Sequence, residues 1–175
     1  MGQDDRQGAT AVQLHEQMTG NTQSGALEVT NQPVAKAELL IRRPAAEVFE
    51  AFVDPDVITK FWFDASSGRL ESGKTVRWHW DRCDAAVEVR VKAVEHNERI
   101  LIEWDDENPT TVEWSFTPRS AHTTYVSVVN SGFSGNGDEI VHQALDSAGG
   151  FALVLAAAKA YLEHGISLNI VADRF

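Results

Sequence analysis

Five tryptophans are the residues of this chain whose type and spacing most strongly suggest chemistry, and that chemistry is binding. Four of them fall on the apolar phase of an alternating pattern, as on one face of a half-buried strand. A predicted helix rich in alanine and glycine faces them, so small side chains oppose large ones. This fits either a tightly packed core or a cavity, because ligand sites are lined mostly by apolar and aromatic side chains. The ligand-binding residues we expect are Trp62, Trp78, Trp80, Trp104, Trp114, Phe116, Val128, Asn130, Phe151 and Leu155.

Asn130 is the polar residue best placed to set the specificity of such a cavity. It continues the alternation of Val126 and Val128, so its amide should point inward; the alternative is a residue that simply ends the strand. Asn130 and His142 also allow an enzymatic alternative, a polyketide-cyclase-like or hydrolase-like protein that orients or protonates its substrate in the same cavity. No activated acid/base pair is visible in the sequence, so no catalytic residue is assigned and catalysis stays open.

Histidine, cysteine and glycine are spaced in ways that disfavour other chemistries. Glu139 and His142 form one Glu-x-x-His, whereas a di-iron bundle needs two copies on separate helices. The single Cys83 excludes an intramolecular disulfide and the multi-cysteine zinc patterns. The glycines of residues 131–137 lack the Lys-Ser/Thr of a phosphate loop and favour a loop that gates the cavity. We therefore expect no metal ion and no cofactor.

The elements that position these residues follow from the hydrophobic periodicity. Residues 34–42 predict a strand, and two short helices follow it, the first beginning at Pro44 and the second at Pro55. Period-two alternation then continues to residue 128 across short polar turns, which predicts a six-stranded antiparallel meander. Residues 138–164 have a helical period and end before Gly165, so they predict one long helix, which the glycine pair 149–150 could kink.

Composition limits the partners and the compartment. The chain carries 15 basic and 26 acidic residues, a formal net charge of −11, which argues against nucleic acid or an anionic membrane as a partner. No secretory signal opens the sequence, and the longest nearly apolar run, residues 149–158, is about half of the roughly 18 residues that span a bilayer. We expect a cytoplasmic protein with no membrane partner, and the oligomeric state stays open.

The chain divides into a tail and one domain. Residues 1–33 contain no aromatic residue and are rich in Gln, Thr, Asn, Gly and Ser, so they cannot bury enough surface to offset the entropy of ordering. We expect a flexible tail over residues 1–33 and one folded domain over residues 34–175.

Several segments resemble the SRPBCC (START-like, birch-pollen-allergen-like) superfamily, and in particular its branch related to the C-terminal domain of the activator of the ninety-kilodalton heat-shock-protein ATPase. They occur in the family's order and together cover about residues 36–170: PAAEVFEAF at 44–52, Phe61-Trp62, Glu103-Trp104, NSGF at 130–133 and KAYLEHG at 159–165. The resemblance implies an α+β helix-grip fold, a curved antiparallel sheet wrapped around a long C-terminal helix with a mostly apolar cavity between them.

The resemblance implies much less about chemistry. The superfamily includes lipid and hormone binders, polyketide cyclases and aromatases, and co-chaperone domains, and this branch has no shared catalytic motif. Our first hypothesis is therefore the binding of a small apolar or aromatic molecule. A co-chaperone domain that stimulates a heat-shock ATPase, with a chaperone as partner, is the further alternative that the resemblance adds.

Overall fold

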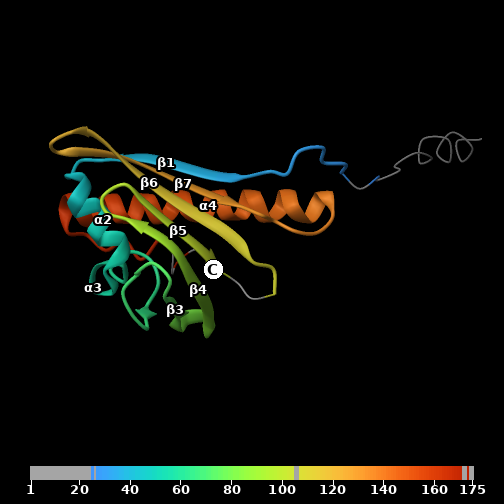
Figure 1. Ribbon diagram of the computed structural model, residues 1–175, viewed down its shortest axis with the longest axis horizontal. Helices are drawn as coiled ribbons and strands as arrows, with labels where there is room; N and C mark the ends of the chain where they lie inside the picture. The colour runs from blue at the N-terminus through green and yellow to red at the C-terminus, as the bar shows by residue number, and fades with distance from the viewer. Residues whose placement is uncertain (1–24, 26, 105–106, 171–172, 174–175) are drawn as a thin grey trace, which may run out of the picture.

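The computed structural model describes residues 25, 27–104, 107–170 and 173. Its elements, labelled in Figure 1, are β1 (Ala35–Ile41), α2 (Ala45–Val53), α3 (Pro55–Ile58), β2 (Ala65–Ser66), β3 (Thr75–Trp80), the 3-10 turn η1 (Asp81–Cys83), β4 (Ala85–Glu95), β5 (Arg99–Trp104), β6 (Thr110–Ser120), β7 (Thr123–Ser131) and α4 (Gly137–His164).

The strands form one antiparallel sheet in the order β1-β7-β6-β5-β4-β3-β2. Strands β2 to β7 are a meander, and β1, the first in the chain, returns to pair with β7 at the opposite edge. The curved sheet lies against α4, which packs mainly on β1 and then on β7 (Figure 1). The predicted α+β helix-grip fold is therefore confirmed. The two-residue strand β2 and the turn η1 were not predicted.

Helix α4 is a single 28-residue helix that continues through Gly149 and Gly150. Its first residue follows Asn136, whose side chain accepts a hydrogen bond from the Glu139 N–H while the Glu139 carboxylate accepts one from the Asn136 N–H. Gly165 ends the helix in the left-handed conformation, φ 69°, as predicted. An 18-residue window of α4 has a mean hydropathy of 1.4, enough by length and composition for a membrane span, but the inward face of α4 belongs to the core of the domain.

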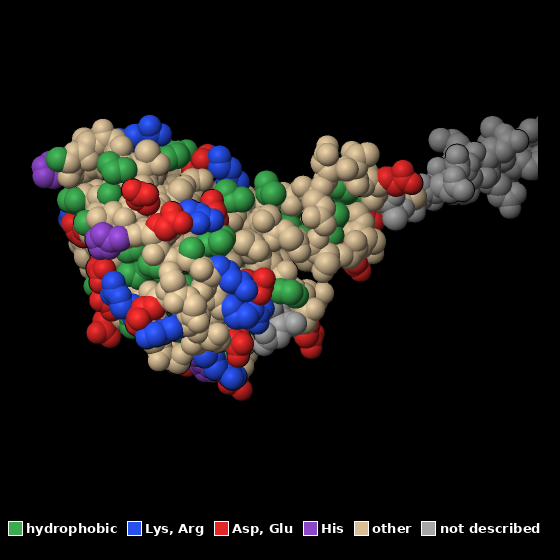
Figure 2. Space-filling view, viewed as in Figure 1, with side chains coloured by type: hydrophobic (Ala, Val, Ile, Leu, Met, Phe, Trp, Pro, Cys, Tyr) green, Lys and Arg blue, Asp and Glu red, His purple; other side chains and the backbone are tan. Residues whose placement is uncertain are grey.

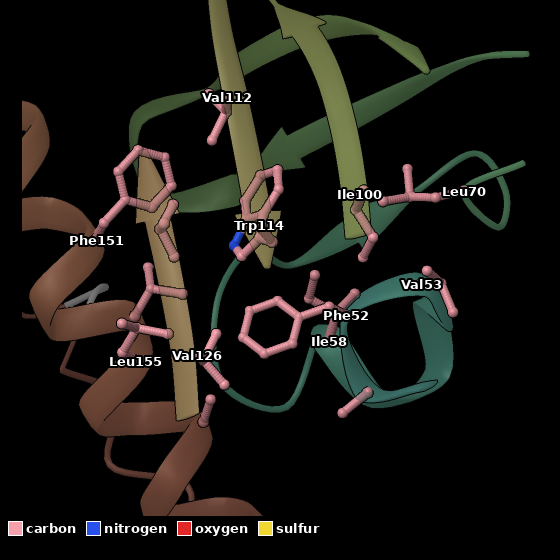
Figure 3. Packing of buried hydrophobic residues seen from close by; sticks show 14 of the residues in the cluster. Phe52, Val53, Ile58, Leu70, Ile100, Val112, Trp114, Val126, Phe151 and Leu155 are labelled. Carbon is pink, nitrogen blue, oxygen red and sulfur yellow. The ribbon is translucent and has the colours of Figure 1, made fainter. Parts of the chain in front are cut away.

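The core fills the space between the concave face of the sheet, α4 and the short helix α2 (Figure 3). Inward residues alternate along the strands, so that Val112, Trp114 and Phe116 of β6 are all buried. Phe52 of α2 reaches both aromatic rings of that strand, with ring centroids 6.4 Å from Trp114 and 5.7 Å from Phe116. Helix α2 therefore packs on the inner face of β6 and contributes to the same core as α4.

The opposite face of the sheet carries paired charges. Figure 2 shows lysine and arginine side chains interspersed with aspartate and glutamate on the visible face. Glu103 accepts a hydrogen bond from Arg90 at 2.8 Å and lies 3.3 Å from Lys92, and these cations hold the pKa of its carboxyl below the usual value. Arg90 and Lys92 alternate along β4 with the buried Val89 and Val91, so their side chains lie outside the core.

Residues just before β1 contact the start of α4. The Leu27 N–H donates to Asp138, and the Gln32 side chain donates to the Phe133 carbonyl. A Cβ at Gly137 would overlap the Leu27 carbonyl oxygen, so this close approach requires glycine. Most of the tail expected over residues 1–33 lies outside the described residues, and its boundary with the domain stays a prediction.

Candidate ligand cavity

A cavity of about 750 Å³ lies between the sheet and the first half of α4 and opens to solvent. This volume is in the range of small-molecule sites, roughly 300–1,000 Å³. The wall takes residues from the C-terminal ends of β3, β5 and β7 and from the N-terminal ends of β4 and β6, which lie at the same end of the sheet because neighbouring strands are antiparallel. The wall consists of Trp62, Trp80, Cys83, Ala86, Val87, Trp104, Asn108, Thr110, Asn130, Phe133, Gln143, Asp146, Ser147, Gly150, Phe151, Leu153 and Val154.

Aromatic rings form the apolar part of the wall. Trp104 stacks on Phe151 of α4, with ring centroids 5.9 Å apart and an angle of 26° between the planes. Trp62 lies against both, at 6.3 Å from Trp104 and 5.9 Å from Phe151. Trp80 and Phe133 complete the aromatic surface. This part of the wall can receive a flat apolar ring by stacking or edge contact.

Asn130 forms the best-defined polar group of the cavity. Its Nδ2 donates to the Thr111 carbonyl at 2.9 Å, and its Oδ1 accepts from the Ser147 hydroxyl of α4 at 2.8 Å. The residue is 2% exposed. A buried polar group without a partner costs about 1–3 kcal/mol, and these two hydrogen bonds avoid that cost. The prediction that the Asn130 amide points inward is confirmed. An amide has two N–H groups, and the second can serve a ligand oxygen.

The remaining polar wall is neutral except for one acid. The Thr110 hydroxyl accepts from the Trp104 indole N–H at 2.8 Å, and the Gln143 amide donates to the Ser134 carbonyl at 3.0 Å. Asp146 is the charged member of the described wall. Among the described residues no group of three or more His, Cys, Asp or Glu is arranged to hold a metal ion.

The ten residues predicted to bind ligand divide into two groups in space. The first group lies on the cavity wall: Trp62, Trp80, Trp104, Asn130 and Phe151. The second group is at most 3% exposed and lies in the packed core, not on the wall itself: Trp78, Trp114, Phe116, Val128 and Leu155. Alternation identifies the face of a strand on which a residue lies, but not how far along the strand a helix covers it. The binding role of both groups stays a prediction.

Helix α4 supplies wall residues that the sequence analysis did not identify. Gln143, Ser147, Gly150 and Val154 recur at helical spacing, each one position before a member of the apolar stripe Ala144, Ala148, Phe151 and Leu155. The polar and small side chains of this stripe were the feature of the sequence that could have identified it as part of a cavity wall. His142 of the enzymatic alternative is exposed and is not part of the wall.

One buried donor behind the wall has no partner. The indole Nε1 of Trp114, in a residue that is 1% exposed, makes no hydrogen bond within the described part of the chain. Such a donor forfeits about 1–3 kcal/mol, and native structures contain few of them.

The matched family is "Activator of Hsp90 ATPase homolog 1-like protein", and the match covers residues 42–163. The chain belongs to this family. The resemblance to this branch of the SRPBCC superfamily is therefore confirmed.

Solved structures of similar proteins share the helix-grip fold of this family member. Protein SSP2350 from Staphylococcus saprophyticus is 32% identical with a TM-score of 0.66, covering 78% of this chain and 96% of that one. DynU16, a protein of the dynemicin biosynthetic locus, is 25% identical with a TM-score of 0.64, covering 77% of this chain and 48% of that one. The Aha1 dimer from Colwellia psychrerythraea is 17% identical with a TM-score of 0.64, covering 76% and 98%. None of the curated proteins matches the chain.

Proposed function

We propose that this chain binds a small, largely apolar aromatic molecule in the cavity between α4 and the sheet, and that it does so in the cytoplasm. The observation that carries the proposal is one space of about 750 Å³ surrounded by Trp62, Trp80, Trp104, Phe133 and Phe151. Small-molecule sites are clefts of roughly 300–1,000 Å³ with mostly apolar and aromatic walls, so an open space of this size with this wall favours a ligand.

The polar end of the cavity supports selection among aromatic ligands. Asn130 and Ser147 are held by each other and by the backbone, so their orientation is fixed before a ligand arrives. The second Asn130 N–H would therefore donate a hydrogen bond to a ligand oxygen only at one fixed position. The similarity to DynU16, a protein of a biosynthetic locus, is consistent with a small organic ligand.

Binding is preferred to catalysis because the described wall does not assemble the predicted acid/base groups. Asn130 lines the cavity, but His142, the group expected to move a proton, is exposed on α4 away from it. Enzymatic proton transfer needs its group within hydrogen-bond reach of the substrate. The described geometry thus orients a ligand more readily than it transforms one.

Titration with a neutral aromatic probe, 1-aminoanthracene, tests the proposal with two independent readouts. We expect saturable quenching of the intrinsic tryptophan fluorescence, because Trp62, Trp80 and Trp104 all lie on the wall. The only cysteine, Cys83, is exposed and also lies on the wall, so the same probe should slow its reaction with a maleimide. Both readouts should give one dissociation constant, in about the micromolar range.

A non-saturable fluorescence change, together with unchanged labelling of Cys83 across neutral, acidic and basic aromatic probes, would count against a ligand cavity. The labelling rate of the urea-unfolded chain is the control, since there the probe has no site to protect.

A further inference from the structure

The ring of Trp62 separates two spaces of different size. On one side it forms part of the wall of the large cavity. On the other side it closes a small inner space that is too small for a water molecule and is lined by Phe52, Ile58, Leu70, Trp78, Ile100 and Trp114. Trp62 is the one residue that lines both spaces.

The unpaired donor lies directly behind this partition. The ring of Trp114 is 6.0 Å from that of Trp62 and 5.9 Å from that of Phe151, and both of these rings line the large cavity. Figure 3 shows the Trp114 nitrogen on the side of its ring that faces Phe151. The nitrogen atom is itself buried, and the inner space that Trp114 lines is too small for water, so solvent does not satisfy this N–H. A buried donor without a partner calls for an explanation, and an absent ligand supplies one.

Trp62 fills a place that suits a flat ring. Besides Trp114 and Phe151, its indole contacts Phe63 at 5.4 Å, Trp78 at 5.0 Å and Trp104 at 6.3 Å, so five aromatic rings surround it. Trp62 itself lies in the irregular segment between α3 and β2, where its backbone N–H donates to the Ile58 carbonyl at 3.0 Å but it has no place in a strand ladder. Its displacement therefore disrupts less structure than that of Phe151, which α4 fixes.

We propose that Trp62 is a movable partition and that the Trp114 N–H is the anchor for the carbonyl, phenol or ether oxygen of a flat aromatic ligand that takes the place of the Trp62 ring. This inference rests on the proposed binding function and names its ligand class: rings of about two fused cycles that carry a hydrogen-bond acceptor. The apolar rings supply contact area, and the single donor selects the oxygen-bearing member of otherwise identical compounds.

The compounds 1-indanone and indane test this, since they have the same bicyclic frame and differ in one carbonyl oxygen. Calorimetry should show that the wild-type chain binds 1-indanone roughly tenfold more tightly than indane. Trp114→Phe keeps an aromatic ring and removes the donor, so it should abolish this preference while changing the indane affinity much less. In ¹⁵N–¹H spectra, the indole resonance that disappears in Trp114→Phe should move downfield when 1-indanone, but not indane, is added to the wild type.

A second variant tests the partition. Trp62→Leu should bind both compounds more tightly than the wild type, because a smaller side chain has to leave the ring site, and it should keep the preference for 1-indanone. An unchanged preference in Trp114→Phe would overturn the anchor, and weaker binding of both compounds to Trp62→Leu would overturn the partition. Either failure with intact binding of 1-aminoanthracene would leave the proposed function standing, whereas loss of that binding too would refute both.

Discussion

Replacing Gly150 by tryptophan is expected to weaken aromatic ligand binding by at least about tenfold without unfolding the protein. Gly150 lies on the cavity wall, between Ser147 and Val154 on the same stripe of α4, so a large side chain there projects into the space a ligand needs. Glycine in a helix interior costs up to about 1 kcal/mol relative to alanine. Replacing it should therefore leave the free energy of unfolding unchanged or slightly higher. Calorimetric titration and urea unfolding measure the two effects.

Ala158→Phe is the matched control for this substitution. Ala158 lies on the same helix but is 0% exposed and belongs to the packed core. Adding a ring there should overpack the core and cost about 1–3 kcal/mol. If Gly150→Trp destabilised the chain as strongly as Ala158→Phe does, the space at Gly150 would be packed core and not a cavity.

Removing the carboxylate of Glu163 should destabilise the fold by about 2 kcal/mol. Its side chain is only 7% exposed, and it accepts from Lys159 at 2.5 Å and from the Arg42 N–H at 2.6 Å, which ties the end of α4 to the end of β1. Breaking a buried ion pair costs about 3–5 kcal/mol, and we expect less because the Lys159 side chain keeps 26% exposure and its bond to the Leu40 carbonyl. Urea unfolding of Glu163→Ala at neutral pH gives the value.

The same carboxylate predicts a pH dependence. Burial raises the pKa of Glu163, but the bonds from Lys159 and the Arg42 N–H outweigh it, so the pKa lies below its usual value. A carboxyl with a depressed pKa in the folded state stabilises the fold above its unfolded pKa, about 4.3, and this contribution disappears as the pH falls through the folded value. Acid should therefore narrow the stability gap between the wild type and Glu163→Ala. Glu71→Ala, which breaks the exposed ion pair between Lys74 and Glu71, is the control variant. A stability gap between the wild type and Glu163→Ala that widened in acid would contradict the assignment.

The periodicity of the sequence was sufficient for the order of strands and helices and for part of the cavity, whereas the helix-grip arrangement was implied by the family resemblance. Alternation placed Asn130 and Trp104 on the inner face, and both line the cavity. It placed Trp114 on that face equally well, but could not show that Phe52 of α2 and Trp62 cover it, since these contacts join segments far apart in the chain. The hydrogen bond between Asn130 and Ser147 could not be predicted for the same reason, because it depends on how α4 is rotated against β7.

The most direct test of ligand binding is native mass spectrometry of the protein purified under non-denaturing conditions from cells that make it. The wild-type chain should carry an additional small mass that is lost on denaturation and absorbs as an aromatic compound. Gly150→Trp, purified in the same way, should show the bare polypeptide. A bare wild-type chain that also acquires no mass from any of a panel of neutral aromatic compounds would contradict the cavity's proposed role.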